Sequence, residues 1–215
     1  MKSLYYALII GVILVAHNSA RAVESIVGQW VSSEPTEELS SPVGSRIFSL
    51  TEYKKDGTVI SGTLIEEDSK YKIEKYNLYR TETFPKRVVI STFPFQLSQD
   101  TLTLSHPPTK MIPMVLKRMD KAPQVPEKPL LGKWKLNYSG PDRIFYTFMP
   151  DGVMRVTAVS FDPLTGKYSE KDGLIEVYRR DVGSAKFKWE IQNGNLMMTR
   201  MDMDKKPETF NRYRP

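Results

Sequence analysis

Apolar and polar residues alternate along short stretches of this chain. In the clearest stretch Phe187, Trp189 and Ile191 alternate with charged residues. A period of two places successive side chains on opposite faces of a β-strand. Shorter runs rich in β-formers lie at residues 88–90 and 102–104, and no window after residue 22 keeps a helical period. The pattern predicts an all-β protein.

Turn signals separate these stretches. Pro150-Asp151-Gly152 suits a type I turn that closes a hairpin, and Asn193-Gly194 is a strong signal for a tight hairpin. Residues 70–79 are ambiguous, and we interpret them as a strand with a break. Short strands joined by hairpins are typical of an antiparallel meander, which closes into a small barrel or folds over as a sandwich.

The pattern occurs twice. Ile26-Val27-Gly28-Gln29-Trp30 matches Leu130-Leu131-Gly132-Lys133-Trp134. Three further pairs follow in the same order, namely 53–57 with 148–152, 95–102 with 189–196, and 116–119 with 210–213. Landmarks repeated in one order indicate a tandem duplication.

The duplication sets the expected domain boundaries. The first unit spans residues 23–119 and the second 131–215, with an extra Ser-, Glu- and Pro-rich loop at 32–45 in the first. Between the units, residues 120–130 contain three prolines. Proline fixes φ and extends its neighbours, so this segment is expected to be an extended linker.

The landmarks resemble those of bacterial lipocalin-like domains. They are Gly-x-Trp on the first strand, aromatic-x-x-Asp-Gly at an early hairpin, and a late strand that ends near an Arg. The resemblance implies two tandem small antiparallel meander β-barrels. Trp30 and Trp134 would then close the base of each barrel, with Arg118 and Arg212 lying across them.

The N-terminus predicts export. A lysine, a short apolar run and Ala20-Arg21-Ala22 form a secretory signal with cleavage after Ala22, and the run is too short for a transmembrane helix. We expect a periplasmic or extracellular protein without a stable membrane span. Loss of the signal lowers the net charge from +6 to +4, and basic residues are interleaved with acids. This distribution predicts no nucleic-acid partner.

Few residues suit catalysis. The chain has no Cys and two His, of which His17 leaves with the signal. Without a base beside a nucleophile, and without a phosphate loop, no catalytic residue, metal site or cofactor is predicted. An enzyme with a site built from Asp, Glu or Tyr is the remaining alternative, because two carboxylates suffice for glycoside hydrolysis. Nothing in the sequence identifies such a pair, so we expect a non-catalytic protein. Glu37-Glu38 and Glu66-Glu67-Asp68 are interpreted as solvated loop charge.

Methionines gather at two matching places. They are Met197, Met198, Met201 and Met203 near the C-terminus, and Met111, Met114 and Met119 in the first half. Thioethers bind copper(I). They also fill irregular gaps in a core, which is the better interpretation here because no His accompanies them.

The resemblance favours a small apolar or amphipathic ligand. Aromatic residues gather in the second half at Tyr146, Phe148, Phe161, Tyr178, Phe187 and Trp189, whereas Ser49 and Thr51 replace Ile144 and Tyr146 in the first. An aromatic-lined cavity with few polar groups is a common small-molecule site. We therefore predict ligand contacts at Tyr146, Phe148, Tyr178 and Trp189. The alternatives are a solid core and an envelope protein-interaction module, such as an inhibitor, an immunity partner or an assembly partner.

Overall fold

The structure is a computed structural model that describes residues 25–38, 45–84, 86–105, 112–120, 128–140, 142–180 and 183–214. Every helix or strand in these ranges is a β-strand, which confirms the all-β class. No described helix is long and apolar enough to cross a membrane. The predicted signal peptide and most of the predicted linker lie outside these ranges.

Fifteen strands make up the described fold. They are β1 (Gly28–Ser32), β2 (Glu37–Glu38), β3 (Arg46–Tyr53), β4 (Thr58–Glu74), β5 (Asn77–Phe84), β6 (Arg87–Ser98), β7 (Thr101–Leu104), β8 (Met114–Arg118), β9 (Gly132–Leu136), β10 (Arg143–Phe148), β11 (Val153–Lys171), β12 (Leu174–Arg179), β13 (Gly183–Gln192), β14 (Asn195–Arg200) and β15 (Glu208–Arg212).

Hairpin turns form where the sequence predicts them. Asn193 and Gly194 join β13 to β14 with φ of 54° and 79°, the left-handed values that a tight hairpin needs. Gly152 closes the β10–β11 hairpin with φ of 81°. Lys75, with φ of 56°, follows the end of β4, and β4 pairs antiparallel with β5 from Glu74 opposite Asn77. Residues 70–79 are therefore a hairpin of two strands, whereas we predicted one strand with a break.

All strands belong to one continuous antiparallel sheet. The last strand of the first half, β8, pairs with the first strand of the second, β9. The long strands β4 and β11 also pair, between Thr58–Lys70 and Val153–Lys167. We predicted a separate barrel for residues 23–119 and another for 131–215, whereas the observed pairing joins both halves in a single sheet.

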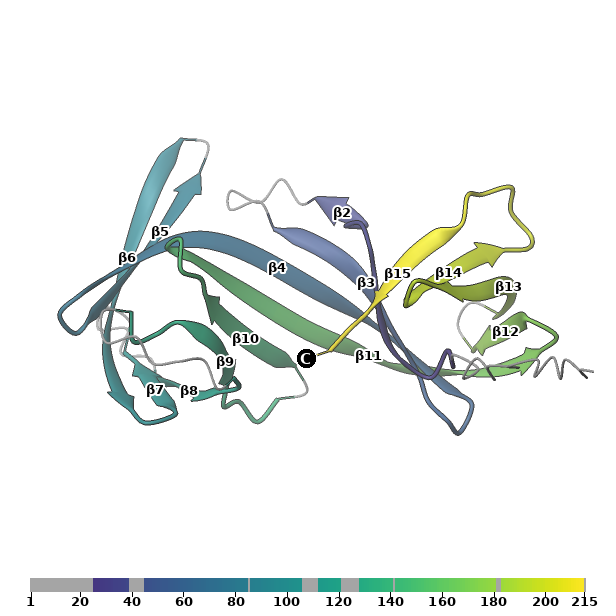
Figure 1. Cartoon of the computed structure of the whole chain (residues 1–215), viewed down its shortest axis with the longest axis horizontal. Coiled ribbons are helices and arrows are strands. Elements are labelled where there is room, and N and C mark those ends of the chain that lie inside the picture. The colour runs from purple at the N-terminus through teal and green to yellow at the C-terminus, as the bar shows by residue number, and fades with distance from the viewer. Residues whose placement is uncertain are drawn as a thin grey trace, which may run out of the picture.

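The pairings close two rings, and each ring takes strands from both halves. Ring A consists of β4, β5, β6, β7, β8, β9, β10 and β11; ring B consists of β1, β3, β4, β11, β12, β13, β14 and β15. Figure 1 shows the rings as two lobes at opposite ends of the shared β4–β11 pair. β4 has 17 residues and β11 has 19. At about 3.3 Å per residue such strands are long enough to serve one ring and continue into the other.

Three apolar clusters fill this framework. The ring A cluster includes Leu78, Phe95, Leu116, Trp134 and Phe148, and the ring B cluster includes Ile26, Trp30, Tyr53, Ile175 and Leu196. A third cluster of Leu50, Leu64, Phe145 and Val159 lies at the waist, where β3 and β10 flank the shared pair. Burial of these side chains holds the two lobes together.

The two tryptophans of the repeated Gly-x-Trp pattern have similar surroundings. Trp30 and Trp134 are both fully buried, and each indole Nε1 donates a hydrogen bond to a carbonyl four residues earlier, at 2.6 and 2.8 Å. The guanidinium of Arg118 lies 4.1 Å from the Trp134 ring, and that of Arg212 lies 4.6 Å from the Trp30 ring. The prediction of an Arg across each Trp is confirmed, but each Arg comes from the other half of the chain.

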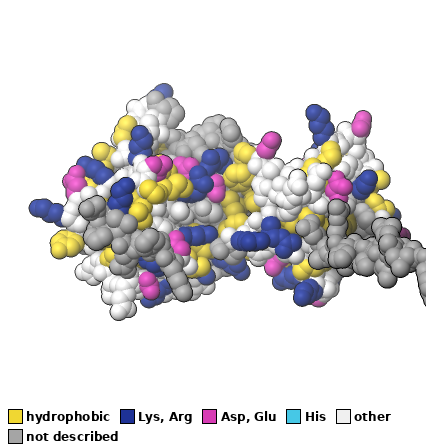
Figure 2. Space-filling model, viewed as in Figure 1, with side chains coloured by type: hydrophobic (Ala, Val, Ile, Leu, Met, Phe, Trp, Pro, Cys, Tyr) yellow, Lys and Arg dark blue, Asp and Glu magenta, His cyan; other side chains and the backbone are white. Residues whose placement is uncertain are grey.

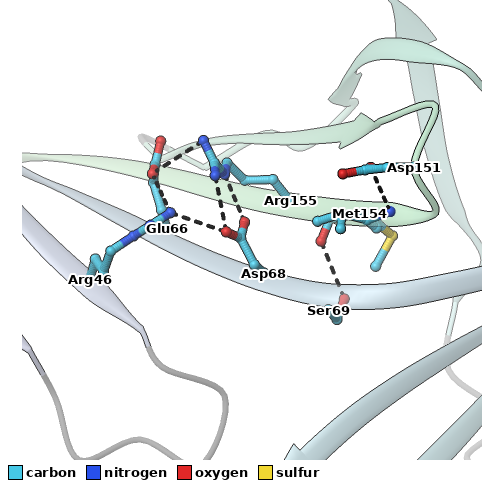
Figure 3. Close-up of polar contacts among 8 residues, drawn as sticks. Arg46, Glu66, Asp68, Ser69, Asp151, Met154 and Arg155 are labelled. Carbon is cyan, nitrogen blue, oxygen red and sulfur yellow. Dashed lines mark hydrogen bonds and ion pairs between the residues drawn. The ribbon is translucent and has the colours of Figure 1, made fainter.

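Charged residues join β3, β4 and β11 beside the waist (Figure 3). Arg155 Nε and Nη2 donate to Asp68 at 2.7 and 3.0 Å, and Arg46 Nη2 donates to Glu66 at 3.0 Å and to Asp68 at 3.2 Å. The hydrogen bonds from Arg155 lower the pKa of Asp68. Residues 66–68 are therefore part of a strand with ion-pair partners, and the prediction of loop charge there is wrong.

Candidate functional site

Ring B contains two adjoining cavities of about 310 and 230 Å³. Thr51, Tyr53, Phe187 and Arg200 line both of them. The two spaces therefore meet at the same side chains inside the ring. We refer to them together as the ring B cavity.

The floor of the ring B cavity is apolar. It is formed by Trp30, Tyr53, Leu196, Met198 and Phe210, all less than a tenth exposed. The Tyr53 hydroxyl donates to Met198 Sδ at 3.6 Å, and burial raises the pKa of Tyr53, so this phenol stays neutral. The floor thus offers rings and a thioether with no formal charge.

The walls differ from the floor because they carry small hydroxyl side chains. Ser49 and Thr51 come from β3 and Ser61 from β4, and Thr51 lies opposite Ser61 in the strand register. At the matching place in ring A, Tyr146 lies opposite Val156. Small hydroxyl residues leave open the space that a tyrosine and a valine occupy in the other ring.

Cationic side chains surround the opening. Arg179 donates to Ser61 Oγ at 3.1 Å and to Asp162 at 3.4 Å, and Arg200 forms two hydrogen bonds with Asp202 at 2.7 and 2.9 Å. Two further cations, Lys205 and Lys206, line the cavity together with the carboxylate of Glu208. Arg179 lines the smaller part of the cavity, and Lys205 and Lys206 line the larger part, so charged groups border both parts of a cavity whose floor is apolar.

Two of the predicted site residues lie in ring A. Phe148 is 2% exposed and belongs to the ring A cluster, where it packs edge-on against Tyr71 at 5.1 Å between ring centroids. Tyr146 packs against the same cluster and donates to Met114 Sδ at 3.6 Å. Burial is the main cause of the raised pKa of Tyr146. Tyr146 and Phe148 are therefore core residues of ring A and lie outside the ring B cavity.

The other two predicted residues lie in ring B. Tyr178 is 55% exposed, and Trp189 packs against the ring B cluster. The buried Nε1 of Trp189 has no hydrogen-bond partner among the described residues. The structure therefore does not bring the four predicted residues together. Of the aromatic residues in the second half, Phe187 is the one that lines both parts of the cavity.

Sequence reasoning missed the contribution of the first half. If each half formed its own barrel, Ser49 and Thr51 would indicate a poorer binding site in the first half. In the structure these residues line the ring B cavity together with Phe187 from the second half. The signal was present in the sequence as small residues at positions where the other half has Ile144 and Tyr146.

Potential metal ligands are scattered over the described ranges. No group of three or more His, Asp or Glu residues there is arranged to hold a metal ion. Among the methionines, Met198 packs in the cavity floor, whereas Met201 and Met203 are 57% and 41% exposed. Met111 lies outside the described residues. Met198 is thus a packing residue, as expected, whereas the exposure of Met201 and Met203 does not agree with core packing.

No protein-family model matches this chain, and no solved structure matches it.

Proposed function

We propose that this chain is an exported, non-catalytic, lipocalin-like binding protein that holds a small amphipathic molecule in the ring B cavity. The observation that carries the proposal is the difference between the two rings. Ring A is packed with Tyr146 and Val156, whereas ring B has Thr51 and Ser61 at the matching positions and an open space beside them.

The size and lining of the cavity suit such a ligand. Small-molecule sites are commonly concave spaces of about 300–1,000 Å³, lined by apolar groups with a few polar ones that fix orientation. The ring B cavity combines aromatic and thioether floor groups with hydroxyl walls and a charged opening. An apolar tail would contact Trp30 and Phe187, and a polar head would reach the opening.

The proposal includes a tandem duplication with exchanged strands. Its support is a set of contacts that occurs twice across the β4–β11 pair. Tyr71 Oη donates to Met149 O at 3.0 Å, and Tyr168 Oη donates to Lys54 O at 2.8 Å. In each case a tyrosine of one long strand bonds to the hairpin that precedes the other. Two barrels that share their long strands would account for this symmetry.

Export rests on the predicted signal at residues 1–22. Cleavage after Ala22 would deliver the mature chain to the periplasm or the exterior. Expression of the full chain in a secreting host, followed by intact-mass measurement, should give a protein that begins at Val23. A mature mass that still includes residues 1–22 would contradict export by this route.

Cavity filling tests ligand binding. The triple variant Ser49→Ile, Thr51→Tyr, Ser61→Val installs the ring A residues in ring B. We expect the wild-type protein, purified from its source, to retain a small molecule in native mass spectrometry, and the triple variant to lose it while keeping its fold. Tyr146→Phe is the control, because it removes a hydroxyl from ring A and leaves ring B unchanged. Ligand retention by the triple variant would contradict the proposed site.

One observation favours the alternative of an envelope protein-interaction module. The β5–β6 hairpin projects from ring A (Figure 1), and it exposes Val88 by 59% and Ile90 by 62%. Exposed apolar side chains on a projecting hairpin are suited to contact another protein. A co-purifying polypeptide that is lost in Val88→Ser, Ile90→Ser would support this alternative instead.

A further inference from the structure

The connection between β14 and β15 lies over the ring B cavity. β14 extends to Arg200, but its pairing with β15 ends at Met198 opposite Glu208. Residues 201–207 therefore leave the ladder at the open side of the ring. We call them the β14–β15 flap. Three flap side chains, Met203, Lys205 and Lys206, line the cavity.

The two lysines of the flap differ from the arginines beside the cavity in their ion pairing. Arg179 and Arg200 already have carboxylate partners in Asp162 and Asp202. Neither Lys205 nor Lys206 forms an ion pair with any described residue, and the cavity lining of the β14–β15 region contains one carboxylate, Glu208. Two ammonium groups thus line a partly enclosed space without an ion-pair partner among the described residues, although Glu208 lines the same space and the flap also contains Asp202 and Asp204.

In ring A, by contrast, a cation has more than one acidic partner. Arg80 pairs there with Glu82 at 2.9 Å and with Glu67 at 3.7 Å, so that two acids accompany one cation. Over the face in Figure 2, basic and acidic side chains are interspersed across both lobes. The pair of lysines at the cavity is therefore a local feature, distinct from the small overall positive charge.

We propose that Lys205 and Lys206 select an amphipath with an anionic head, such as a carboxylate, and hold that head at the flap while its apolar tail contacts the floor. The inference rests on the proposed function, since it names the ligand class of the same cavity. A carboxylate beside two ammonium groups gains charge-assisted hydrogen bonds, and the apolar floor favours a tail in place of water. Met203 on the same flap would cover the tail next to the head.

Matched fluorescent probes test the charge preference. Dansylamino-undecanoate carries a carboxylate, and dansylamino-undecanol has the same tail with a neutral head. We expect the wild-type protein to bind the acid at least about tenfold more tightly than the alcohol at low salt, which is the effect of one to two favourable charge contacts. Raising the ionic strength to about 0.5 M should reduce this preference, because the flap is open to solvent.

Variants locate the preference at the flap. Lys205→Gln, Lys206→Gln should weaken binding of the acid by about tenfold and leave the alcohol within about twofold. Lys205→Arg, Lys206→Arg should restore the affinity for the acid. The control is Lys171→Gln, Lys188→Gln, which makes the same change of charge at exposed positions of ring B strands. We expect this control to bind both probes like the wild type.

The outcomes separate this inference from the proposed function. Equal affinity for acid and alcohol, or an unchanged acid affinity in the flap glutamine variant, would overturn anion selection while the cavity remains a binding site. Equal losses in the flap variant and the Lys171, Lys188 control would also overturn it, because the effect would then come from net charge. Failure of both probes to bind the wild-type protein would overturn the proposed function itself.

Discussion

Arg118 connects the two halves of the chain through a single side chain. It ends β8, is 4% exposed, and donates from Nη1 to Leu131 O at 2.7 Å and from Nη2 to Pro129 O at 3.1 Å. Its guanidinium also lies over the Trp134 ring. One planar cation therefore satisfies two carbonyls at the start of the second half and covers the indole at the same time.

Arg118→Met is expected to lower the free energy of unfolding by about 2–3 kcal/mol, because two partly buried carbonyls lose a charged donor. The free energy of unfolding of Arg118→Lys should lie between the values of Arg118→Met and the wild type, since an ammonium cannot reach both carbonyls and also stack on the ring. Urea unfolding followed by tryptophan fluorescence measures the effect. Lys117→Met, on the exposed side of the same strand, is the control, and an equal loss in both variants would contradict this role of Arg118.

Asp68 makes stability depend on pH. Its pKa is lowered in the folded state, mainly by hydrogen bonds from Arg155, relative to about 3.9 in an unfolded chain. The stabilisation is therefore complete above about pH 4 and is lost as the pH falls through the folded value. We expect Asp68→Asn to cost about 1 kcal/mol near pH 7, a modest effect because the carboxylate is partly exposed.

Unfolding of the wild type and Asp68→Asn at several pH values tests this expectation. The difference between them should narrow as the pH is lowered below about 4. Asp202→Asn provides a comparison, because the pKa of Asp202 is lowered by Arg200, a neighbour on the chain at an exposed site. A stability difference for Asp68→Asn that stays constant down to the acid limit would show that its ionisation is not coupled to folding.

At the level of the elements, the long strands β4 and β11 determine the architecture. Their pairing has one irregularity, where residues 162–164 of β11 have no register partner between Phe161 and Thr165. Gly62 lies opposite Phe161 at this place, and a Cβ on Gly62 would lie 2.5 Å from Ser160 O. The close approach of the two backbones therefore depends on glycine.

Gly62→Ala is expected to destabilise the protein by about 1–3 kcal/mol, because one of the paired strands must shift to admit a methyl group. The loss should appear as a lower midpoint in urea with an unchanged slope. Ser160→Ala changes an exposed residue of the same ladder and should have little effect. If Gly62→Ala is as stable as Ser160→Ala, the two strands do not approach as closely as the structure indicates.

The sequence predicts the local parts of these elements well. Asn193-Gly194 and the Asp-Gly hairpins are recognised because turn geometry depends on two or three adjacent residues. The pairing of β4 with β11 is not recognisable in this way, since it joins segments about a hundred residues apart whose alternation fits many partners. The acids at 66–68 also resemble a loop until Arg46 and Arg155 approach from other strands.

The candidate site was predictable only in part for the same reason. Phe187 and the differences at Ser49 and Thr51 are visible in the sequence, but their meaning depends on which strands share a ring. If each half formed its own barrel, the aromatic-rich second half would contain the site. Because each ring takes strands from both halves, Tyr146 and Phe148 fill ring A instead. A cavity forms where small residues of one half meet the strands of the other.

At the scale of the whole molecule, neither half forms a complete ring from its own described strands. Ring A needs β9 and β10 from the second half, and ring B needs β1 and β3 from the first. The covalent link through residues 121–127 is therefore not what holds the halves together. Strand pairing at β8–β9, β4–β11 and β15–β1 and the waist cluster do so. Both lobes should consequently unfold in one transition.

Cutting the chain between the halves tests this organisation directly. A specific protease site placed at residues 122–127, followed by cleavage, should give two polypeptides that still elute together at the size of the intact protein. We expect native mass spectrometry to show a one-to-one complex, and urea to separate it. The midpoint of unfolding should now rise with protein concentration, because a unimolecular fold has become an association. Two halves that elute separately in buffer, each with native β-structure, would contradict the shared sheet and support one independent barrel per half.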